Sequence, residues 1–546
     1  MKTSAVKISI LLLFLISGSS LNAQVTYDRM LHPDREPQNW LTYGGDYASH
    51  RYSQLAEINK ENVNNLQLKW IHRFTTMKNA ENTPLVVDGI LYTGDTNQVE
   101  AIDAVTGRTY WTYSHTVDPK GVFVLPMFKG FAISGNKLFW ATLDGHLIAL
   151  DAKNGQLIWD KVIAVWQKGY QLNVAPLVVK DKVILGPATN EEGANCWIAA
   201  YDINTGNEIW RFNTVPEPGE ANFGTWPGDS WKRGGAPIWV TGTYDPQTNL
   251  TYWGTGNPNP GWNGDPRSPG DNLYSDTVVA LDTDTGKLKW HYQFTPNDEF
   301  DWDSVEVPVL VDLTWKGKPR KVMLFANRNG FFYVLDRTTG EFLNGTAFVK
   351  QNWNVGFDTK GRPTKAAGHV ATYEGTFIRP GVQGGTNWYS PSYSPRTGLF
   401  YVSTWQNYSA YSAKKDQQWV EGQRYTGVGP GTAAHPKAVP PFFKTTEEGY
   451  GAVIALDPHT GEKKWEAKMT DYTDAGVLTT ASDLAFSGGK EGNFFALDAR
   501  TGDFLWKVNL GGMVASSPMT YSVNGHQYVA VCGGNALFVF GLPDKK

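Results

Sequence analysis

The sequence contains little cysteine, and it lacks any long apolar run beyond its first residues. Cys196 and Cys532 are the only cysteines among 546 residues, which excludes a multi-disulfide scaffold but leaves a single bond between the two open. No Cys-x-x-Cys-His motif occurs, so we expect no covalently attached c-type haem. Because no later apolar run is long enough to cross a bilayer, we expect a protein that does not span the membrane.

The first 23 residues have the pattern of a secretory signal peptide. Two lysines border an apolar run at 8–18, and small residues lead to a cleavage point after Ala23. We therefore predict a signal peptide at 1–23, a mature chain at 24–546 and a periplasmic location. Cleavage removes two lysines and no acid, so the net charge falls from −4 to −6. Such an acidic balance argues against a nucleic-acid partner.

One pattern recurs along most of the chain. An apolar segment ends in aspartate, two variable residues and a Thr-Gly or Asn-Gly pair follow, and tryptophan comes four residues after the glycine. The copies that end in tryptophan are 99–111, 147–159, 198–210, 278–290, 453–465 and 494–506. A seventh copy, 332–344, ends in Asn344. The pattern predicts a β-hairpin, because glycine supplies the positive φ of the turn and aspartate can bond the turn backbone.

These hairpins predict an all-β fold, an eight-bladed β-propeller in which tryptophans dock between blades. One sheet cannot bury both of its faces, so the repeated sheets must stack around an axis. The segment 66–70 resembles the end of an eighth copy, and 527–542 could supply its other strands. Asn344 lacks a ring and is expected to mark the weakest contact between blades. We expect equivalent positions for Trp111, Trp159, Trp210, Trp290, Trp465 and Trp506.

The stretch 295–304, which reads TPNDEFDWDS, concentrates four carboxylates beside two aromatic rings. Taken alone, such a cluster is typical of a solvated turn. In an extended segment, however, Asp301 and Asp303 point to one side while Trp302 points to the other. The stretch by itself therefore leaves a solvated turn and a functional acid pair both open.

Two further segments, 39–70 and 234–265, resemble those of the quinoprotein alcohol dehydrogenases. The second contains GGAPIW and GTGNP, and the resemblance extends over about residues 38–542. It implies one eight-bladed propeller domain over 24–546 that holds pyrroloquinoline quinone (PQQ) and a metal ion. It also implies that the chain is a PQQ-dependent alcohol dehydrogenase.

The resemblance implies a metal site made only of oxygen ligands. Glu191, Asn257 and Asp301 match the family's ligands, with Glu192 as an alternative register for the glutamate. Asp303 matches an aspartate that lanthanide members carry where calcium members commonly have a small neutral residue. A third carboxylate balances a trivalent ion, so we favour a lanthanide(III) ion and keep Ca²⁺ as the alternative.

The resemblance also implies the catalytic residues and part of the cofactor pocket. Asp301 matches the catalytic base, and Arg328 matches the cation beside the quinone carbonyls. Trp239 matches the tryptophan beneath the cofactor ring, and Glu81 matches a glutamate at the edge of the pocket.

Several positions around the implied cofactor depart from the family pattern. The segment 121–132 lacks the two adjacent cysteines that often lie against the quinone, and 188–190 replaces a run of small residues. Lys129 stands where the family has arginine, and Asn173 stands where it has threonine. Lys129 can still pair with a carboxylate and Asn173 can still donate a hydrogen bond. We therefore include both in the predicted cofactor-binding set.

The resemblance implies the oxidation of a small alcohol by hydride transfer to metal-bound PQQ. Asp301 takes the hydroxyl proton, and Arg328 stabilises the charge that develops on oxygen. Without a haem motif, the electrons must pass to a separate acceptor, expected to be a soluble cytochrome. Loops within 405–450 are expected to shape the substrate entrance. The alternative is a PQQ-free propeller of the same descent, acting as a ligand-binding or structural envelope protein.

Overall fold

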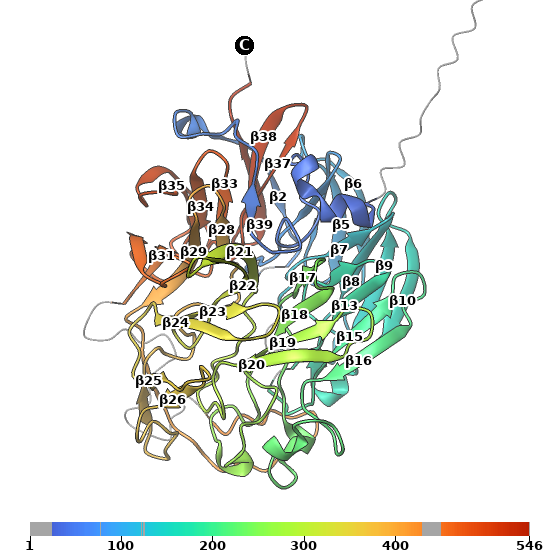
Figure 1. The fold of residues 1–546 in the computed structure, drawn as a ribbon. Helices are drawn as coiled ribbons and strands as arrows, with labels where there is room; N and C mark the ends of the chain where they lie inside the picture. The colour runs from blue at the N-terminus through green and yellow to red at the C-terminus, as the bar shows by residue number, and fades with distance from the viewer. Residues whose placement is uncertain are drawn as a thin grey trace, which may run out of the picture.

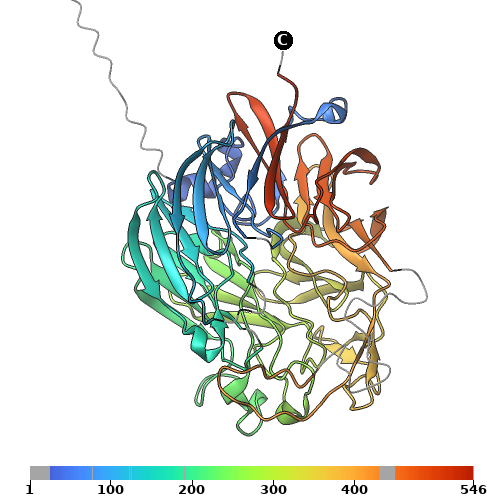
Figure 2. The same cartoon turned by 180° about the vertical axis from the view of Figure 1, so that it is seen from behind.

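The computed structural model describes residues 25–544, except 77, 122, 124–125, 190 and 429–448. The predicted signal peptide at 1–23 lies outside the described residues. Eight sheets, each built on four antiparallel strands and one extended by a fifth strand, stand around a common axis (Figures 1 and 2), which confirms the predicted eight-bladed β-propeller. We number the sheets as blades 1 to 8 in chain order.

Each of the first four blades is built from consecutive antiparallel strands. Blade 1 contains β3 (Leu85–Val87), β4 (Ile90–Gly94), β5 (Gln98–Asp103) and β6 (Thr109–Ser114). Blade 2 contains β7 (Ala132–Ser134), β8 (Lys137–Ala141), β9 (His146–Asp151) and β10 (Leu157–Val162). Blade 3 contains β12 (Leu177–Val179), β13 (Lys182–Leu185), β15 (Trp197–Asp202) and β16 (Glu208–Asn213). Blade 4 contains β17 (Thr243–Asp245), β18 (Leu250–Gly254), β19 (Thr277–Asp282) and β20 (Leu288–Gln293).

The remaining blades follow the same plan until the ring closes. Blade 5 contains β21 (Val309–Trp315), β22 (Lys318–Ala326), β23 (Phe331–Asp336) and β24 (Phe342–Ala347). Blade 6 contains β28 (Ser392–Ser394), β29 (Leu399–Gln406), β31 (Tyr450–Leu456) and β32 (Lys463–Lys468). Blade 7 contains β33 (Leu478–Thr480), β34 (Leu484–Gly488), β35 (Asn493–Asp498) and β36 (Phe504–Asn509), and β1 (Tyr52–Ser53) adds to β33 in parallel.

Blade 8 joins the two ends of the chain. It contains β37 (Met519–Val523), β38 (His526–Gly533) and β39 (Ala536–Gly541), and its outer strand is β2 (Gln67–Arg73) from near the N-terminus. Figure 1 shows the blue β2 beside the red C-terminal strands. The split eighth blade expected from 66–70 and 527–542 is therefore present, and it removes a free sheet edge from the ring.

Short elements connect and cover the blades. The helical segments are α1 (Tyr27–Leu31), η1 (Pro33–Arg35), η2 (Val63–Asn65), η3 (Trp166–Lys168), η4 (Phe223–Thr225), η5 (Ser230–Arg233) and η6 (Asp265–Arg267). The small strand pairs are β11 (Tyr170–Gln171) with β14 (Ala188–Thr189), β25 (Asn354–Phe357) with β26 (Pro363–Lys365), and β27 (Thr376–Ile378) with β30 (Ala410–Ser412). The described part of the chain contains no helix with the length and apolar composition that a bilayer crossing requires.

The tryptophans dock between blades as the repeat predicts. In each case the ring lies on the turn glycine of the next blade, and the indole N–H donates to a carbonyl of that blade at 3.0–3.3 Å. A Cβ at Gly155, for example, would come within 2.5 Å of the Trp111 ring. The ring–glycine pairs are Trp70–Gly107, Trp111–Gly155, Trp159–Gly206, Trp210–Gly286, Trp290–Gly340 and Trp465–Gly502.

Two junctions depart from this rule. Trp506 holds the equivalent register position in blade 7, opposite Ala496, but its ring packs against Phe540 of blade 8 at 5.3 Å. Blade 8 differs because its last strand pairs with β2 and carries no repeat turn. At Asn344 the ring is missing, and the hydroxyl of Thr346 donates to Thr460 O at 2.8 Å instead.

The two cysteines are buried and unpaired, so no disulfide joins Cys196 to Cys532. The core consists of apolar clusters between the faces of neighbouring blades. In blade 1, β4 is buried from Leu91 onward while the outer strand β6 alternates between exposed and half-buried residues. Burial therefore increases from the rim of the propeller toward its axis.

Candidate cofactor and metal site

The acidic stretch of 295–304 is buried, so its interpretation as a solvated turn is wrong. Asp298, Glu299, Asp301 and Asp303 all have less than 10% of their surface exposed. The stretch lies in the loop between β20 and β21. It is not extended at Asp301, whose φ is +61°, because the Asp298 carboxylate accepts the backbone N–H groups of Phe300 and Trp302 and folds the loop.

Arg328 joins the two central aspartates despite this bend. It extends from the turn between β22 and β23, and its Nη2 lies 3.2 Å from Asp301 Oδ2. Its Nη1 donates to Asp303 Oδ2. The guanidinium is held from behind, since its Nε donates to Val382 O at 2.8 Å and its backbone N–H donates to Glu306 Oε1 at 3.1 Å. Arg328 is therefore fixed against both carboxylates.

Glu191 and Asn257 complete the predicted metal-binding group. The backbone N–H of Asn257 donates to Asp303 Oδ1 at 2.6 Å, and its side-chain amide donates to Glu191 Oε2 at 3.2 Å. Asn259 donates to the same Glu191 oxygen at 3.1 Å. Glu192 lies elsewhere, with its side chain against Gly169. The residue that faces the aspartates is thus Glu191 and not its neighbour.

The electrostatics of this group favour a cation. Burial raises the pKa of the Asp301 carboxyl well above its usual range; Arg328 opposes the rise, whereas Asp303 and Glu191 add to it. Burial also raises the pKa of Glu191, with repulsion from Asp303 as a further cause. Asp301 and Asp303 share the Arg328 guanidinium, Glu191 lies close enough to raise the pKa of Asp301 further, and the available metal donors are oxygens. The residues present therefore fit a hard metal ion.

The predicted cofactor residues meet beside the metal-binding group. The Lys129 ammonium forms an ion pair with Glu81 and lies 3.7 Å from the ring centre of Trp388 and 5.6 Å from that of Trp239. The backbone N–H of Lys129 donates to Asn173 O at 3.2 Å. Lys129, Glu81, Asn173 and Trp239 are therefore brought together.

These four residues suit a planar anionic ligand. Trp239 stays half-buried although residues 234–238 and 240 are buried, so one side of its ring borders open space. The buried Asn173 Oδ1 has no hydrogen-bond partner among the described residues. The aromatic floor and the buried ammonium suit a planar, carboxylated cofactor, and the unpartnered Asn173 oxygen can accept a hydrogen bond from a donor group of such a ligand.

A pocket of about 590 Å³ opens above the metal-binding group. Asp301 and Arg328 form part of its wall, and residues of 415–428 form much of the rest. This agrees with the expectation that loops within 405–450 shape an entrance, although Trp405 is buried against Tyr472. Residues 429–448 of that predicted range lie outside the described residues.

The structure adds three residues that the sequence reasoning missed. Asn259 binds Glu191, Glu306 supports Arg328, and Trp388 covers Lys129. The spacing of Asn259, two positions after Asn257, offered a signal for the first. Glu306 lies three positions after Asp303, just past the acidic stretch, whereas Trp388 sits in a segment without a repeated or acidic pattern.

Comparison with known proteins identifies the class. The family model described as "PQQ: Glucose/ethanol/alcohol dehydrogenase, beta-propeller domain" matches residues 40–347 and 364–529. The quinohemoprotein alcohol dehydrogenase of Comamonas testosteroni is 39% identical over 91% of this chain and 72% of its own. The quinoprotein alcohol dehydrogenase PedH of Pseudomonas putida is 36% identical over 96% and 91%. A europium-containing methanol dehydrogenase superposes with a TM-score of 0.87 at 33% identity, over 94% of this chain and 100% of its own.

The chain belongs to the quinoprotein alcohol dehydrogenase family. The resemblance read from the sequence is thereby confirmed, and with it the class of enzyme, a PQQ-dependent alcohol dehydrogenase. The expected cofactors, PQQ with a lanthanide or calcium ion, agree with the family model and with the europium-containing neighbour. The alternative of a PQQ-free propeller is not favoured.

Proposed function

We propose that this protein oxidises a small alcohol in the periplasm and passes the electrons to a separate soluble cytochrome. The observation that carries the proposal is the buried group of Asp301, Asp303 and Arg328 at the base of an open pocket. The proposed mature protein is a single propeller domain over 24–546, preceded by a signal peptide at 1–23. The absence of a haem-attachment motif supports an external electron acceptor.

Glu191, Asn257, Asp301 and Asp303 are the proposed metal ligands. Their donors are oxygens, which suit a hard cation, and three of the four are carboxylates. A trivalent ion balances that charge better than a divalent one. We therefore expect a lanthanide in preference to Ca²⁺.

Trp239, Lys129, Asn173, Glu81 and Arg328 are the proposed PQQ-binding residues. Trp239 offers the floor for a planar ring, and Lys129 offers a cation for a carboxylate. Because Lys129 is already paired with Glu81, its ammonium is held in place before the cofactor arrives. Asn173 offers a side-chain amide in place of the family's threonine hydroxyl.

Asp301 and Arg328 are the proposed catalytic residues. The bound cofactors supply the hydride acceptor and the Lewis acid. Asp301 accepts the proton of the substrate hydroxyl as the hydride leaves the adjacent carbon, so that the alcohol becomes an aldehyde or ketone. Arg328, fixed by Val382 and Glu306, keeps a positive charge beside the oxygen atoms on which negative charge develops.

A titration of the purified protein with PQQ tests this proposal. We expect saturable binding of one PQQ per chain in the presence of La³⁺ or Ca²⁺, and its loss in Trp239→Ala. Trp159→Phe, which alters a docking tryptophan between blades, is the control and should bind PQQ normally. No PQQ binding at micromolar concentrations with either ion would favour the PQQ-free alternative.

A further inference from the structure

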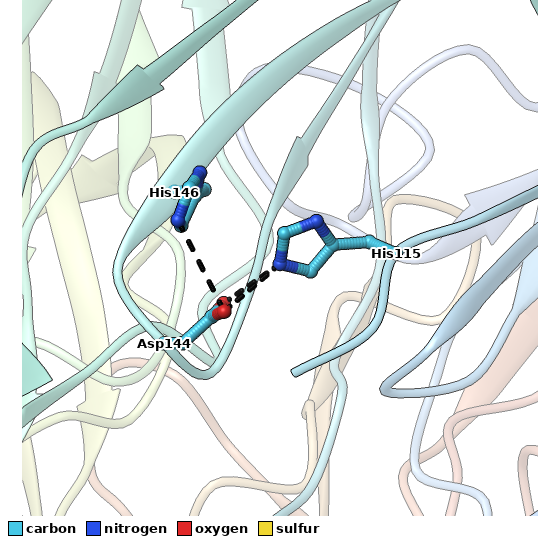
Figure 3. A group of neighbouring side chains, drawn as sticks. All are labelled: His115, Asp144 and His146. Atoms are coloured by element: carbon cyan, nitrogen blue, oxygen red, sulfur yellow. Dashed lines mark hydrogen bonds and ion pairs between the residues drawn. The ribbon is translucent and has the colours of Figure 1, made fainter. Parts of the chain in front are cut away.

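A second group of metal-ligating side chains lies between blades 1 and 2 (Figure 3). His115 follows directly after β6 of blade 1, while Asp144 lies in the turn from β8 to β9 of blade 2 and His146 is the first residue of β9. The Nε2 atom of His115 lies 3.0 Å from both Asp144 carboxylate oxygens, and Nε2 of His146 lies 4.0 Å from Asp144 Oδ2. One ligand atom from each residue lies within 4.8 Å of the other two.

The backbone and neighbouring side chains hold the three residues in place. The Thr142 hydroxyl donates to Asp144 Oδ1 at 2.6 Å, and the Thr142 N–H donates to His146 O at 2.9 Å, which closes the turn. The His115 N–H donates to Asn97 O at 3.0 Å, so β6 extends its pairing to this point. The ligands therefore stand on ordered strand ends, with Asp144 only 7% exposed.

Asp160 orients the ring of His146. Its Oδ1 lies 2.7 Å from His146 Nδ1. A carboxylate at one ring nitrogen fixes the tautomer and leaves the lone pair of the other nitrogen free, the arrangement that metal-binding histidines use. In His146 the free nitrogen is Nε2, which Figure 3 shows directed toward Asp144.

A simple ion pair explains only part of this arrangement. His72 and Glu100 form such a pair at 2.5 Å in blade 8 and blade 1, and a single histidine suffices there. Between blades 1 and 2, a second imidazole lies 4.9 Å from the first, centre to centre. Two imidazolium ions at that distance repel, whereas two neutral imidazoles can share one cation.

We propose that His115, Asp144 and His146 bind a divalent transition-metal ion, zinc foremost, that fastens blade 1 to blade 2. Two imidazole nitrogens and one carboxylate oxygen are ligands that zinc accepts, with water in the fourth position. Zinc–ligand bonds of about 2.0–2.1 Å place tetrahedral ligand atoms about 3.4 Å apart. The two nitrogens lie 3.0 and 4.0 Å from Asp144 Oδ2, on either side of that value, and all three ligand atoms lie within 4.8 Å of one another, so side-chain rotation can close the site.

Titration of the full chain with Co²⁺ and Zn²⁺ tests this site. Excess La³⁺ is present throughout, so that the oxygen-only group near Asp301 is filled with a harder ion. We expect one equivalent of Co²⁺ to give the visible absorption of a nitrogen- and oxygen-ligated ion, and Zn²⁺ to displace it. Zinc should also raise the midpoint of thermal unfolding, because a ligand that binds only the folded state stabilises it.

Variants identify the ligands. His115→Ala and His146→Ala should each weaken zinc binding at least tenfold, and Asp160→Asn should weaken it about 10–100-fold through the ring of His146. His72→Gln removes a histidine of similar exposure from a plain ion pair and should leave binding unchanged. Alcohol oxidation and circular dichroism of each variant should match the wild type, which excludes misfolding as the cause.

Two results would overturn the proposal. The first is the absence of a Co²⁺ absorption band or of a zinc-dependent shift in the wild type at up to 100-fold molar excess. The second is equal zinc affinity in the wild type and in a His115→Ala/His146→Ala double variant, which would place any bound ion elsewhere.

Discussion

The aspartates of the hairpin turns and the aspartates near the propeller axis have opposite electrostatic environments. In the turn of blade 3, Asp202 Oδ1 accepts the N–H groups of Asn204 and Thr205 at 2.9 and 2.8 Å and the Thr205 hydroxyl at 3.0 Å. These hydrogen bonds outweigh burial and hold the pKa of Asp202 below its usual range. The pKa of Asp301 is shifted in the opposite direction, because burial and neighbouring acids dominate there.

This difference separates acids that build the fold from acids that are available for chemistry. Against burial, the Tyr110 hydroxyl and the turn groups of Thr106 likewise lower the pKa of Asp103, so these carboxylates are satisfied within their own hairpins. Asp301 and Asp303 share one arginine and lie beside Glu191, so their charge is incompletely balanced within the chain. Incomplete balance in a buried site is what an added cation corrects.

The largest expected effect is the loss of activity in Asp301→Asn. The amide cannot accept the substrate proton, so we expect kcat to fall by about 10²–10⁴-fold with either La³⁺ or Ca²⁺. The measurement is steady-state oxidation of a primary alcohol by PQQ-loaded protein. Asp202→Asn is the matched control, since it changes a turn acid in the same way and should keep full activity. Equal rates in the two variants would mean that Asp301 is not the base.

Asp303→Ala should change which metal ion activates the enzyme. Its removal leaves two carboxylates, Glu191 and Asp301, which balance a divalent ion better than a trivalent one. We expect the ratio of La³⁺- to Ca²⁺-dependent activity to fall about tenfold or more, with Asp301 still in place. If Ca²⁺ activates the wild type as well as La³⁺ does, and the variant keeps that ratio, Asp303 does not select the metal.

Asp202→Ala should affect stability and leave catalysis unchanged. The substitution leaves two turn N–H groups without their acceptor, which costs about 1–2 kcal/mol in related capping arrangements. Urea unfolding followed by tryptophan fluorescence measures the loss, and alcohol oxidation at saturating PQQ measures catalysis. Asp34→Ala, at an exposed aspartate, should cause a smaller change. If Asp202→Ala is as stable as the wild type, the glycine and the neighbouring strands hold the turn without the aspartate.

The turn aspartates should also contribute to the decrease in the free energy of unfolding at acid pH. Their folded pKa lies below the unfolded value of about 4. Their contribution is therefore present above pH 4 and is lost as the pH falls through the lower folded pKa. We expect Asp202→Asn to lose less stability than the wild type between pH 5 and about pH 2. If the free energy of unfolding depends on pH in the same way in the two proteins, Asp202 does not contribute to the acid sensitivity.

The repeat predicted most of the fold, because each copy specifies its own turn and its own contact with the neighbouring blade. Asp, Gly and Trp recur at fixed spacing, so strand ends, turns and blade junctions followed directly from the sequence. The arrangement of the site was harder to predict from the sequence. The bend at Asp301 depends on hydrogen bonds to Asp298. Which of Glu191 and Glu192 faces the site depends on the hydrogen bond from Asn259. Neither the local partner Asp298 nor the distant partner Asn259 leaves a periodic signal in the chain.

The contacts of Lys129 also could not be predicted from the sequence alone. The sequence identified Lys129, Glu81 and Trp239 separately, each through a motif of its own segment. Their meeting with Trp388 depends on how distant blades converge at the axis. Burial near the axis also could not be read locally, since an acidic stretch such as 295–304 is more often solvated.

The smallest expected effect concerns the turn of blade 6, whose Gly461 has Thr346 of blade 5 against it in place of a tryptophan ring. There Thr346 bonds Thr460 O, and Trp315 stacks on His459 at 5.9 Å, so other side chains already cover part of the gap. Asn344→Trp should place a ring on Gly461, as Trp290 does on Gly340, and stabilise the protein by about 0.5–1.5 kcal/mol. The urea midpoint measures this gain, and activity should not change. A midpoint that is unchanged or lower would mean that Thr346 and Trp315 already complete the junction, so that Asn344 does not mark a weak contact.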